Sequence, residues 1–204
     1  MEEIGTRIAV TNSLLYKVAF GLLGLGLRPQ EVLPVRWDDI TSDWTGVHIQ
    51  RAVTRALGPG ETKRVTKEKA PKSDAGDRCL PVSPSLATLL KKWRLQCPAT
   101  AFGLVLPNRE GGILHHKTLY DALKRAQAAT DVSRLDLMAF RHTFGTALIE
   151  GREADNQVAR LMGHADTTVT RKVYTHAFHR NEGSLVADAF ADAIFRSVDK
   201  ASKK

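Results

Sequence analysis

The sequence predicts an α+β domain that is mainly α-helical, with a small three-stranded antiparallel sheet near its N-terminal third. Two patterns favour this fold class. Apolar residues recur at helical spacing between about residues 11 and 33 and again after Pro84, whereas residues 46–82 alternate strand-like pieces with turn-forming stretches. The chain has 204 residues, of which 43% are hydrophobic, so it is long enough to bury a core of its own.

The first helical stretch is interrupted by Gly24, Gly26 and Pro29. Its apolar residues at helical spacing are Leu14, Leu15, Val18, Leu22, Leu25, Val32 and Leu33. Because glycine and proline break helices, the pattern predicts two helices that meet at a glycine-containing corner.

Three strand-like pieces follow, and their sequences are GVHIQRAVTR, RVTKEKAP and RCLPV. The stretches LGPGE and KSDAGD separate them, and both are rich in residues that form turns. This alternation predicts the three antiparallel strands.

The rest of the chain reads as helical. Helices are predicted over residues 84–95 and 116–129, with a loop between them. Asp136 is a suitable N-cap for a further helix whose buried stripe holds Phe140. The next helix, over about residues 154–162, is expected to end at Gly163, since glycine suits the left-handed conformation beyond a C-terminus.

Positive charge is concentrated in the middle of the chain. The formal net charge is +8 and the sequence pI is about 9.7. Residues 51–94 hold eleven lysines and arginines against four acidic residues, whereas residues 1–50 hold four against six. Such a surplus marks either a solvated face or the surface that meets a polyanion such as DNA.

Several classes of protein are disfavoured. No apolar run approaches the roughly 20 residues that span a bilayer, so we expect no membrane partner and a cytoplasmic protein. Cys79 and Cys97 lack paired spacing, and the histidines lack the spacing of metal ligands, so no metal site is expected. The glycines do not follow a nucleotide-binding order.

Three separated motifs carry chemistry: GLRPQEVLPVRWDDI around Arg28, FRHTFGTALI around Arg141, and LMGHADTTVTRKVYTH, which contains His164 and Tyr174. In this order they resemble the tyrosine recombinases of the phage integrase family. The resemblance runs from about residue 14 to residue 179. It implies the fold of the DNA breaking-rejoining enzymes and the activity of a site-specific DNA recombinase.

The residue types suit that reaction. Attack on a phosphodiester places negative charge on the non-bridging oxygens, and fixed cations stabilise it. The resemblance gives this task to Arg28 and Arg141, whose planar forks keep their charge. It makes Tyr174 the nucleophile of a 3'-phosphotyrosyl intermediate. Because the pKa of tyrosine is about 10, Tyr174 needs the cations or His164 nearby to lose its proton. No ATP, metal or other cofactor is implied.

The resemblance also assigns supporting roles. Lys72 matches the lysine that protonates the leaving 5'-oxygen, with Lys69 as the alternative. Glu31 lies one helical turn after Arg28 and either orients it, holds a catalytic water or forms a structural ion pair. His142 points about 100 degrees away from Arg141 around a helix and is expected to brace the fold.

The basic hairpin that the strands of residues 46–82 form is expected to lie against the DNA, which would account for the charge surplus. The predicted DNA-binding residues are Arg51, Arg55, Lys63, Arg64, Lys67, Lys69 and Arg78.

One position departs from the family pattern, because Met138 stands where a histidine precedes the second arginine by three residues. A thioether neither donates a hydrogen bond to phosphate nor moves a proton. Losing one such donor typically costs about 10² to 10³ in rate. The alternatives to an active recombinase are a catalytically attenuated DNA-binding relative and a type IB topoisomerase-like enzyme that only relaxes DNA.

The expected organisation is a catalytic domain over residues 1–180, followed by a C-terminal helix and basic tail over residues 181–204 that packs either in trans on a neighbouring subunit or on its own core. The N-terminal core-binding domain of the family is expected to be absent. The resemblance implies double-stranded DNA and a homotetramer on it, with accessory directionality or host DNA-bending proteins as further partners. The setting would be the cytoplasm of a prokaryotic cell or a phage-infected host.

Overall fold

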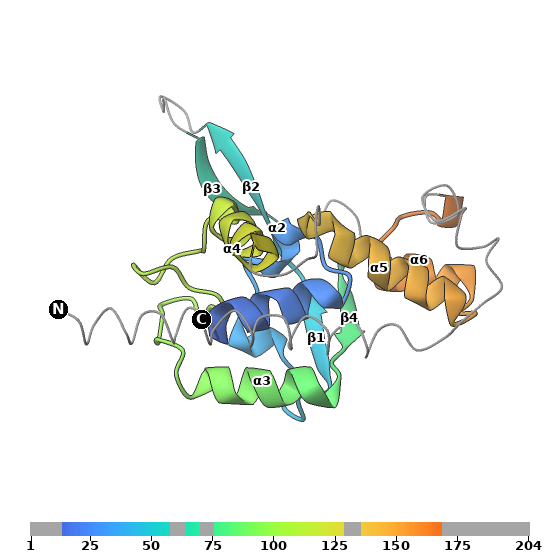
Figure 1. Ribbon diagram of the computed structural model, residues 1–204, viewed down its shortest axis with the longest axis horizontal. Coiled ribbons are helices and arrows are strands. Elements are labelled where there is room, and N and C mark those ends of the chain that lie inside the picture. The colour runs from blue at the N-terminus through green and yellow to red at the C-terminus, as the bar shows by residue number, and fades with distance from the viewer. Residues whose placement is uncertain (1–13, 58–63, 70–75, 129–135, 169–204) are drawn as a thin grey trace.

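The computed structural model describes residues 14–57, 64–69, 76–128 and 136–168 (Figure 1). A helix covers residues 14–24. The elements that follow are α2 (Pro29–Val32), η1 (Trp37–Asp39), β1 (Gly46–Ile49), β2 (Ala52–Leu57), β3 (Arg64–Lys69), β4 (Arg78–Pro81), α3 (Pro84–Arg94), α4 (His116–Ala128), α5 (Leu137–Glu150) and α6 (Asp155–Met162). This order confirms a mainly helical domain with small antiparallel strands near the N-terminal part.

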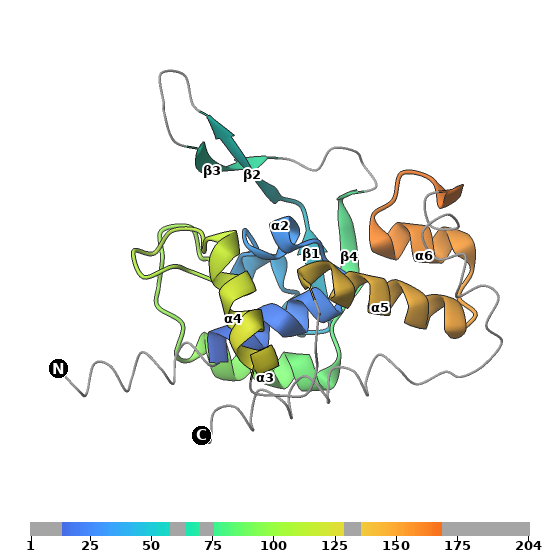
Figure 2. The same ribbon diagram turned by 45° about the horizontal axis from the view of Figure 1, so that its top comes forward.

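The strands pair differently from the prediction. Instead of one three-stranded sheet, the described residues form two antiparallel ladders, β1 with β4 and β2 with β3. The piece read as one strand breaks between Ile49 and Ala52, where Arg51 turns its guanidinium onto buried Asp39. The two halves therefore pair with different partners, and the β2–β3 hairpin projects away from the body (Figures 1 and 2).

Two helices begin at side-chain N-caps, of which the sequence predicted the first. Asp136 accepts a hydrogen bond from the Ala139 amide at 2.7 Å at the start of α5. Ser83 does the same for the Leu86 amide at 3.3 Å at the start of α3. These bonds satisfy backbone donors that a helix leaves without an intrahelical partner, so both helices begin where the sequence indicated.

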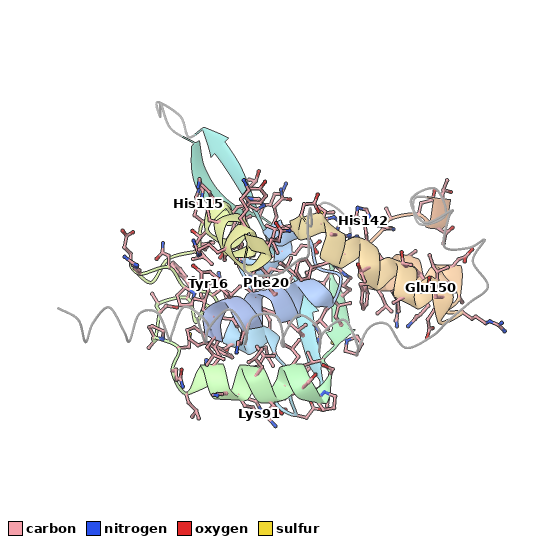
Figure 3. The ribbon with its side chains drawn as sticks, viewed as in Figure 1. Tyr16, Phe20, Lys91, His115, His142 and Glu150 are labelled. Carbon is pink, nitrogen blue, oxygen red and sulfur yellow. The ribbon has the colours of Figure 1, made fainter. Side chains whose placement is uncertain are left out.

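The core forms around the helix over residues 14–24, which lies in the middle of the molecule (Figure 1). Phe20, labelled in Figure 3, stacks on Phe140 of α5 with ring centroids 5.6 Å apart. Fully buried Trp93 of α3 donates its indole N–H to the Val105 carbonyl at 2.7 Å. These contacts join the first helix, α3 and α5 around one apolar interior, which fixes the frame on which the polar residues stand.

The corner after the first helix requires glycine. Gly26 has φ of +81°, and a Cβ there would lie 2.4 Å from the Phe144 ring of α5. The predicted glycine-containing corner is thus confirmed, and it brings the backbone of residue 26 directly against α5. Arg28 follows two residues later and therefore also lies near α5 and the end of α6.

Helix α6 ends as predicted. Gly163 adopts the left-handed conformation, with φ of 62° and ψ of 43°. The Gly163 amide bonds the Arg160 carbonyl at 3.1 Å, and the His164 amide bonds the Ala159 carbonyl at 2.9 Å. The chain therefore leaves α6 in a tight turn that holds His164 at the helix end.

Candidate active site

Arg28 stands at the start of α2 and is partly exposed, with 36% of its side chain open to solvent. Its backbone N–H donates to Glu31 Oε2 at 2.8 Å, and its Nη1 donates to Glu31 Oε1 at 2.8 Å. A longer bond of 3.4 Å joins Nη2 to the Gly163 carbonyl. Glu31 thus holds the guanidinium from one side, while part of it faces outward.

Glu31 itself is buried between two arginines. Besides Arg28, it accepts from Arg78 Nη2 at 2.9 Å and from Arg78 Nη1 at 3.5 Å. Burial alone would raise the pKa of Glu31, but the hydrogen bond and charge of Arg78, with those of Arg28, outweigh it and lower the pKa. Glu31 is therefore a carboxylate that neutralises part of the positive charge around it.

Arg78 lies inside the molecule, although we predicted that it contacts DNA. Its side chain is 3% exposed. Nε donates to the Leu161 carbonyl at 2.8 Å, and Nη1 donates to the Gly76 carbonyl at 3.2 Å. A guanidinium so enclosed has no face for a phosphate, which disfavours the predicted DNA contact and points instead to a role inside the cluster.

Arg141 comes from α5 and is also almost fully buried. Nη1 donates to the Gly26 carbonyl at 2.6 Å, and Nη2 donates to the Met162 carbonyl. The side chain therefore ties the glycine corner to the end of α6. Because both terminal nitrogens are bonded within the fold, Arg141 acts on His164 through its charge.

The three arginines meet at one place, the C-terminal end of α6. Successive carbonyls of Leu161, Met162 and Gly163 accept from Arg78, Arg141 and Arg28 respectively. The last carbonyls of a helix lack intrahelical partners and carry the negative end of its dipole, so cations are stabilised there. Figure 2 shows how β4 and α5 reach this end of α6.

His164 follows directly and feels all three cations. Burial, and after it the charges of Arg141, Arg28 and Arg78, lower the pKa of His164 to about 4, with Glu31 opposing them. At neutral pH the imidazole is therefore uncharged, so one ring nitrogen can donate a hydrogen bond and the other can accept one.

The two remaining candidates lie four residues apart on α5. Met138 is partly buried in the first turn of the helix, three residues before Arg141. His142 is exposed on α5, where Figure 3 labels it. The described structure thus joins Arg28, Glu31, Arg141 and His164 in one cluster and leaves His142 at the surface.

Besides buried Arg78, the predicted DNA-binding residues fall into three groups. Arg51 pairs with buried Asp39 and has 22% of its side chain exposed, so much of its charge is neutralised within the fold. Lys69 lies opposite Ala52 in the β2–β3 ladder. Arg55, Arg64 and Lys67 also lie in that ladder. Lys63, Lys72 and Tyr174 lie outside the described residues, as does the predicted segment 181–204.

Sequence reasoning missed the pair that ties the hairpin to the body. Arg36 Nη2 bonds the two carboxylate oxygens of Glu68 at 3.0 and 2.8 Å. The residues are 32 positions apart, so the local pattern around either one does not indicate the other as its partner. The three α6 carbonyls were equally hidden because backbone groups leave no mark in a sequence.

Among the described residues no group of three or more His, Cys, Asp or Glu side chains is arranged to hold a metal ion. No helix in the part of the chain that the structure describes is long and apolar enough to cross a membrane.

Comparison with known proteins supplies an independent observation. A family model described as Phage integrase family matches residues 5–180. Tyrosine recombinase XerC-like of Caldanaerobacter subterraneus subsp. tengcongensis is 27% identical over 187 residues, covering 84% of this chain and 47% of the relative. Tyrosine recombinase XerD of Listeria innocua is 24% identical over 162 residues, covering 76% and 47%. The chain thus spans about half the length of these relatives.

Solved structures share the fold. The Tn1549 transposon integrase in complex with transposon right end DNA has a TM-score of 0.63 at 18% identity, covering 86% of this chain and 56% of that one. The XerA recombinase has a TM-score of 0.60 at 13% identity, covering 96% and 62%. The XerH site-specific recombinase bound to palindromic difH substrate has a TM-score of 0.55 at 22% identity, covering 84% and 43%.

Proposed function

Because this chain belongs to the phage integrase family, we propose that it is a site-specific DNA recombinase that cleaves and rejoins DNA through a covalent bond to Tyr174. The observation that carries the proposal is the meeting of Arg28, Glu31, Arg141 and His164, which come from three separate motifs, at the end of α6. A cluster of cations around a neutral imidazole suits a phosphodiester whose charge grows in the transition state.

In the proposed reaction the phenolate oxygen of Tyr174 attacks the scissile phosphorus. The bond from phosphorus to the 5'-oxygen breaks, a 3'-phosphotyrosyl bond forms, and the leaving 5'-oxygen takes a proton from Lys72. Rejoining reverses these steps, so the bond energy is conserved without ATP, metal or other cofactor. Arg28 is the proposed contact to the phosphate oxygens, since part of its guanidinium is exposed.

The neutral state of His164 supports its part in the proposal. An uncharged imidazole can accept the proton of the Tyr174 hydroxyl, which an imidazolium cannot. The same cations that lower the pKa of His164 would also favour the phenolate over the phenol. A phosphate bound beside them adds negative charge and would raise the pKa of His164.

The proposed partner is double-stranded DNA, on which the protein acts as a homotetramer in the cytoplasm of a prokaryotic cell or a phage-infected host. One related structure is described as a transposon integrase in complex with transposon right end DNA, and another as a site-specific recombinase bound to its palindromic difH substrate. Accessory directionality or host DNA-bending proteins remain proposed partners. The division into a catalytic domain over residues 1–180 and a tail over residues 181–204 is likewise part of the proposal.

Met138 favours a second candidate, a catalytically attenuated DNA-binding relative. The side chain lies one turn before Arg141 in α5, where it supplies no donor to a phosphate. A type IB topoisomerase-like enzyme would share the chemistry and differ in producing no recombinants. Plasmid relaxation, adduct formation and recombinant products together distinguish these alternatives.

Relaxation of supercoiled plasmid at low salt, with covalent DNA adducts trapped by detergent, tests the proposal without a known target site. The parent chain should relax the plasmid and form covalent adducts, whereas Tyr174→Phe should do neither. The matched control, Tyr120→Phe, should behave as the parent does. Arg28→Lys should lower the rate by about 10² to 10³ because lysine lacks the fork, and Met138→His should raise it by up to about 10².

If the parent and Met138→His both bind DNA but neither relaxes the plasmid nor forms an adduct, the recombinase is rejected in favour of the DNA-binding relative. Relaxation without any recombinant product, on plasmids that carry a site identified by selection, would favour the topoisomerase-like enzyme.

A further inference from the structure

We propose that Arg78 is a positioning residue for strand cleavage: it holds Glu31 and the end of α6 so that Arg28 and His164 act on one phosphate. This role rests on the proposed function. Arg78 itself does not touch the DNA, because its side chain is 3% exposed, compared with 36% for Arg28.

The contacts of Arg78 join three elements. It is the first residue of β4, its Nη2 donates to Glu31 Oε2 in α2 at 2.9 Å, and its Nε donates to the Leu161 carbonyl in α6 at 2.8 Å. A third bond reaches back to the Gly76 carbonyl at 3.2 Å. One planar group thus sets the distance between the carboxylate that orients Arg28 and the helix end that carries His164.

Arginine is the side chain that this geometry requires. Its Nε and the two terminal nitrogens point in fixed directions, so one guanidinium bonds a carboxylate and a carbonyl at the same time. Lysine would keep the positive charge but has a single nitrogen on a flexible stem. Arg78→Lys therefore separates the charge of Arg78 from its fork.

Loss of Arg78 would change both sides of the site. Glu31 would keep its bonds to Arg28 but lose those to Arg78. The Leu161 carbonyl, at the turn before His164, would lose the Arg78 Nε–H that donates to it. Misplacement of catalytic groups by about 1 Å can cost about 10² in rate. DNA affinity would remain, because a buried side chain contributes no phosphate contact.

The test compares Arg78→Gln and Arg78→Lys with Arg94→Gln. The control removes an exposed arginine of α3 whose guanidinium lies over the Trp37 ring of η1. Cleavage rates are measured with plasmid at saturating protein, and affinity is measured for a random duplex at several salt concentrations. We expect cleavage to fall about 10² in Arg78→Gln and about 10-fold in Arg78→Lys, with affinity and salt dependence unchanged. Arg94→Gln should cleave at the parent rate.

Two results would overturn the role of Arg78. One is cleavage at the parent rate in a folded Arg78→Gln or Arg78→Lys chain. The other is weaker DNA binding with a salt slope reduced by about one, which is the mark of a lost phosphate contact. Circular dichroism establishes folding, and Arg78→Lys keeps the test open if Arg78→Gln does not fold.

Failure of both the parent chain and Met138→His to cleave any DNA would reject the proposed function, and the role of Arg78 is then judged without activity. In nuclear magnetic resonance titrations the pKa of His164 should rise in Arg78→Gln, and the amides of Gly163 and His164 should exchange faster in both Arg78 variants. If neither changes relative to Arg94→Gln, Arg78 does not hold this end of α6.

Discussion

Three cations and one carboxylate share the end of α6. Buried charges are costly unless they are paired and hydrogen-bonded. Here Glu31 pairs with both Arg28 and Arg78, and three successive carbonyls take one guanidinium each. The negative end of the helix dipole therefore helps to gather arginines that would otherwise repel one another, and this explains why partners from distant motifs converge there.

The pKa of His164 makes stability depend on pH. It is about 4 in the folded chain, compared with an ordinary value of 6.5. The unfolded chain therefore takes up a proton between pH 6.5 and 4 that the folded chain refuses. The free energy of unfolding should therefore fall as pH falls through this window. Above pH 6.5 His164 is uncharged in both states, so this destabilising effect should be absent there.

Urea unfolding at about pH 7.5 and about pH 5 checks this expectation, because the two values lie on either side of the ordinary histidine pKa. His164→Gln should lose less stability on acidification than the parent. An identical loss in both chains would mean that His164 does not carry the effect.

At the scale of elements, the glycine corner and the hairpin are held in different ways. The corner at Gly26 packs directly on Phe144 of α5. The β2–β3 hairpin is held by ion pairs, Arg36 with Glu68 and Arg51 with Asp39. Packing fixes the first rigidly, whereas the partly exposed Arg36–Glu68 pair holds the second more weakly.

Gly26→Ala should lower the free energy of unfolding by about 3 kcal/mol, because the alanine adds backbone strain at positive φ and a clash with Phe144. Gly103→Ala is the matched control: Gly103 also has positive φ, but a Cβ there meets nothing within 4 Å. It should cost only the strain, about 1 kcal/mol. Equal losses in chemical denaturation would show that the contact with Phe144 is not tight.

Glu68→Gln should loosen the hairpin while leaving global stability nearly unchanged. The pair with Arg36 is 28% and 29% exposed, and such pairs contribute at most about 1 kcal/mol, or about fivefold in local opening. Hydrogen exchange should therefore quicken by about two- to fivefold in β2 and β3 and stay the same in α3. Asp121→Asn, which breaks the exposed pair with Lys117 on α4, should leave hairpin exchange unchanged.

For the whole molecule, the sequence predicted what depends on local chemistry. The caps at Asp136 and Gly163, the corner at Gly26 and the helix boundaries follow from residue preferences over a few positions, and the structure bears them out. The division of one extended piece into β1 and β2 did not follow, because it depends on Asp39, twelve residues from Arg51.

The site was predicted in part. The sequence motifs brought Arg28, Arg141 and His164 together through a family resemblance, and the structure clusters all three. The burial of Arg78 could not be foreseen, because an arginine within a basic segment has the same local pattern whether it faces solvent or an internal carboxylate. Only the fold places Glu31, 47 residues away, beside it.

The central claim is that Tyr174 forms the covalent bond to DNA, and the most direct test identifies the modified residue. Adducts trapped by detergent are digested with nuclease and protease, and the peptide that carries a nucleotide is sequenced by mass spectrometry. The chain has three tyrosines, Tyr16, Tyr120 and Tyr174, so the assignment is unambiguous. We predict a phosphotyrosyl linkage on Tyr174 alone, whereas a linkage on Tyr16 or Tyr120, or no adduct from an active chain, would contradict the proposed mechanism.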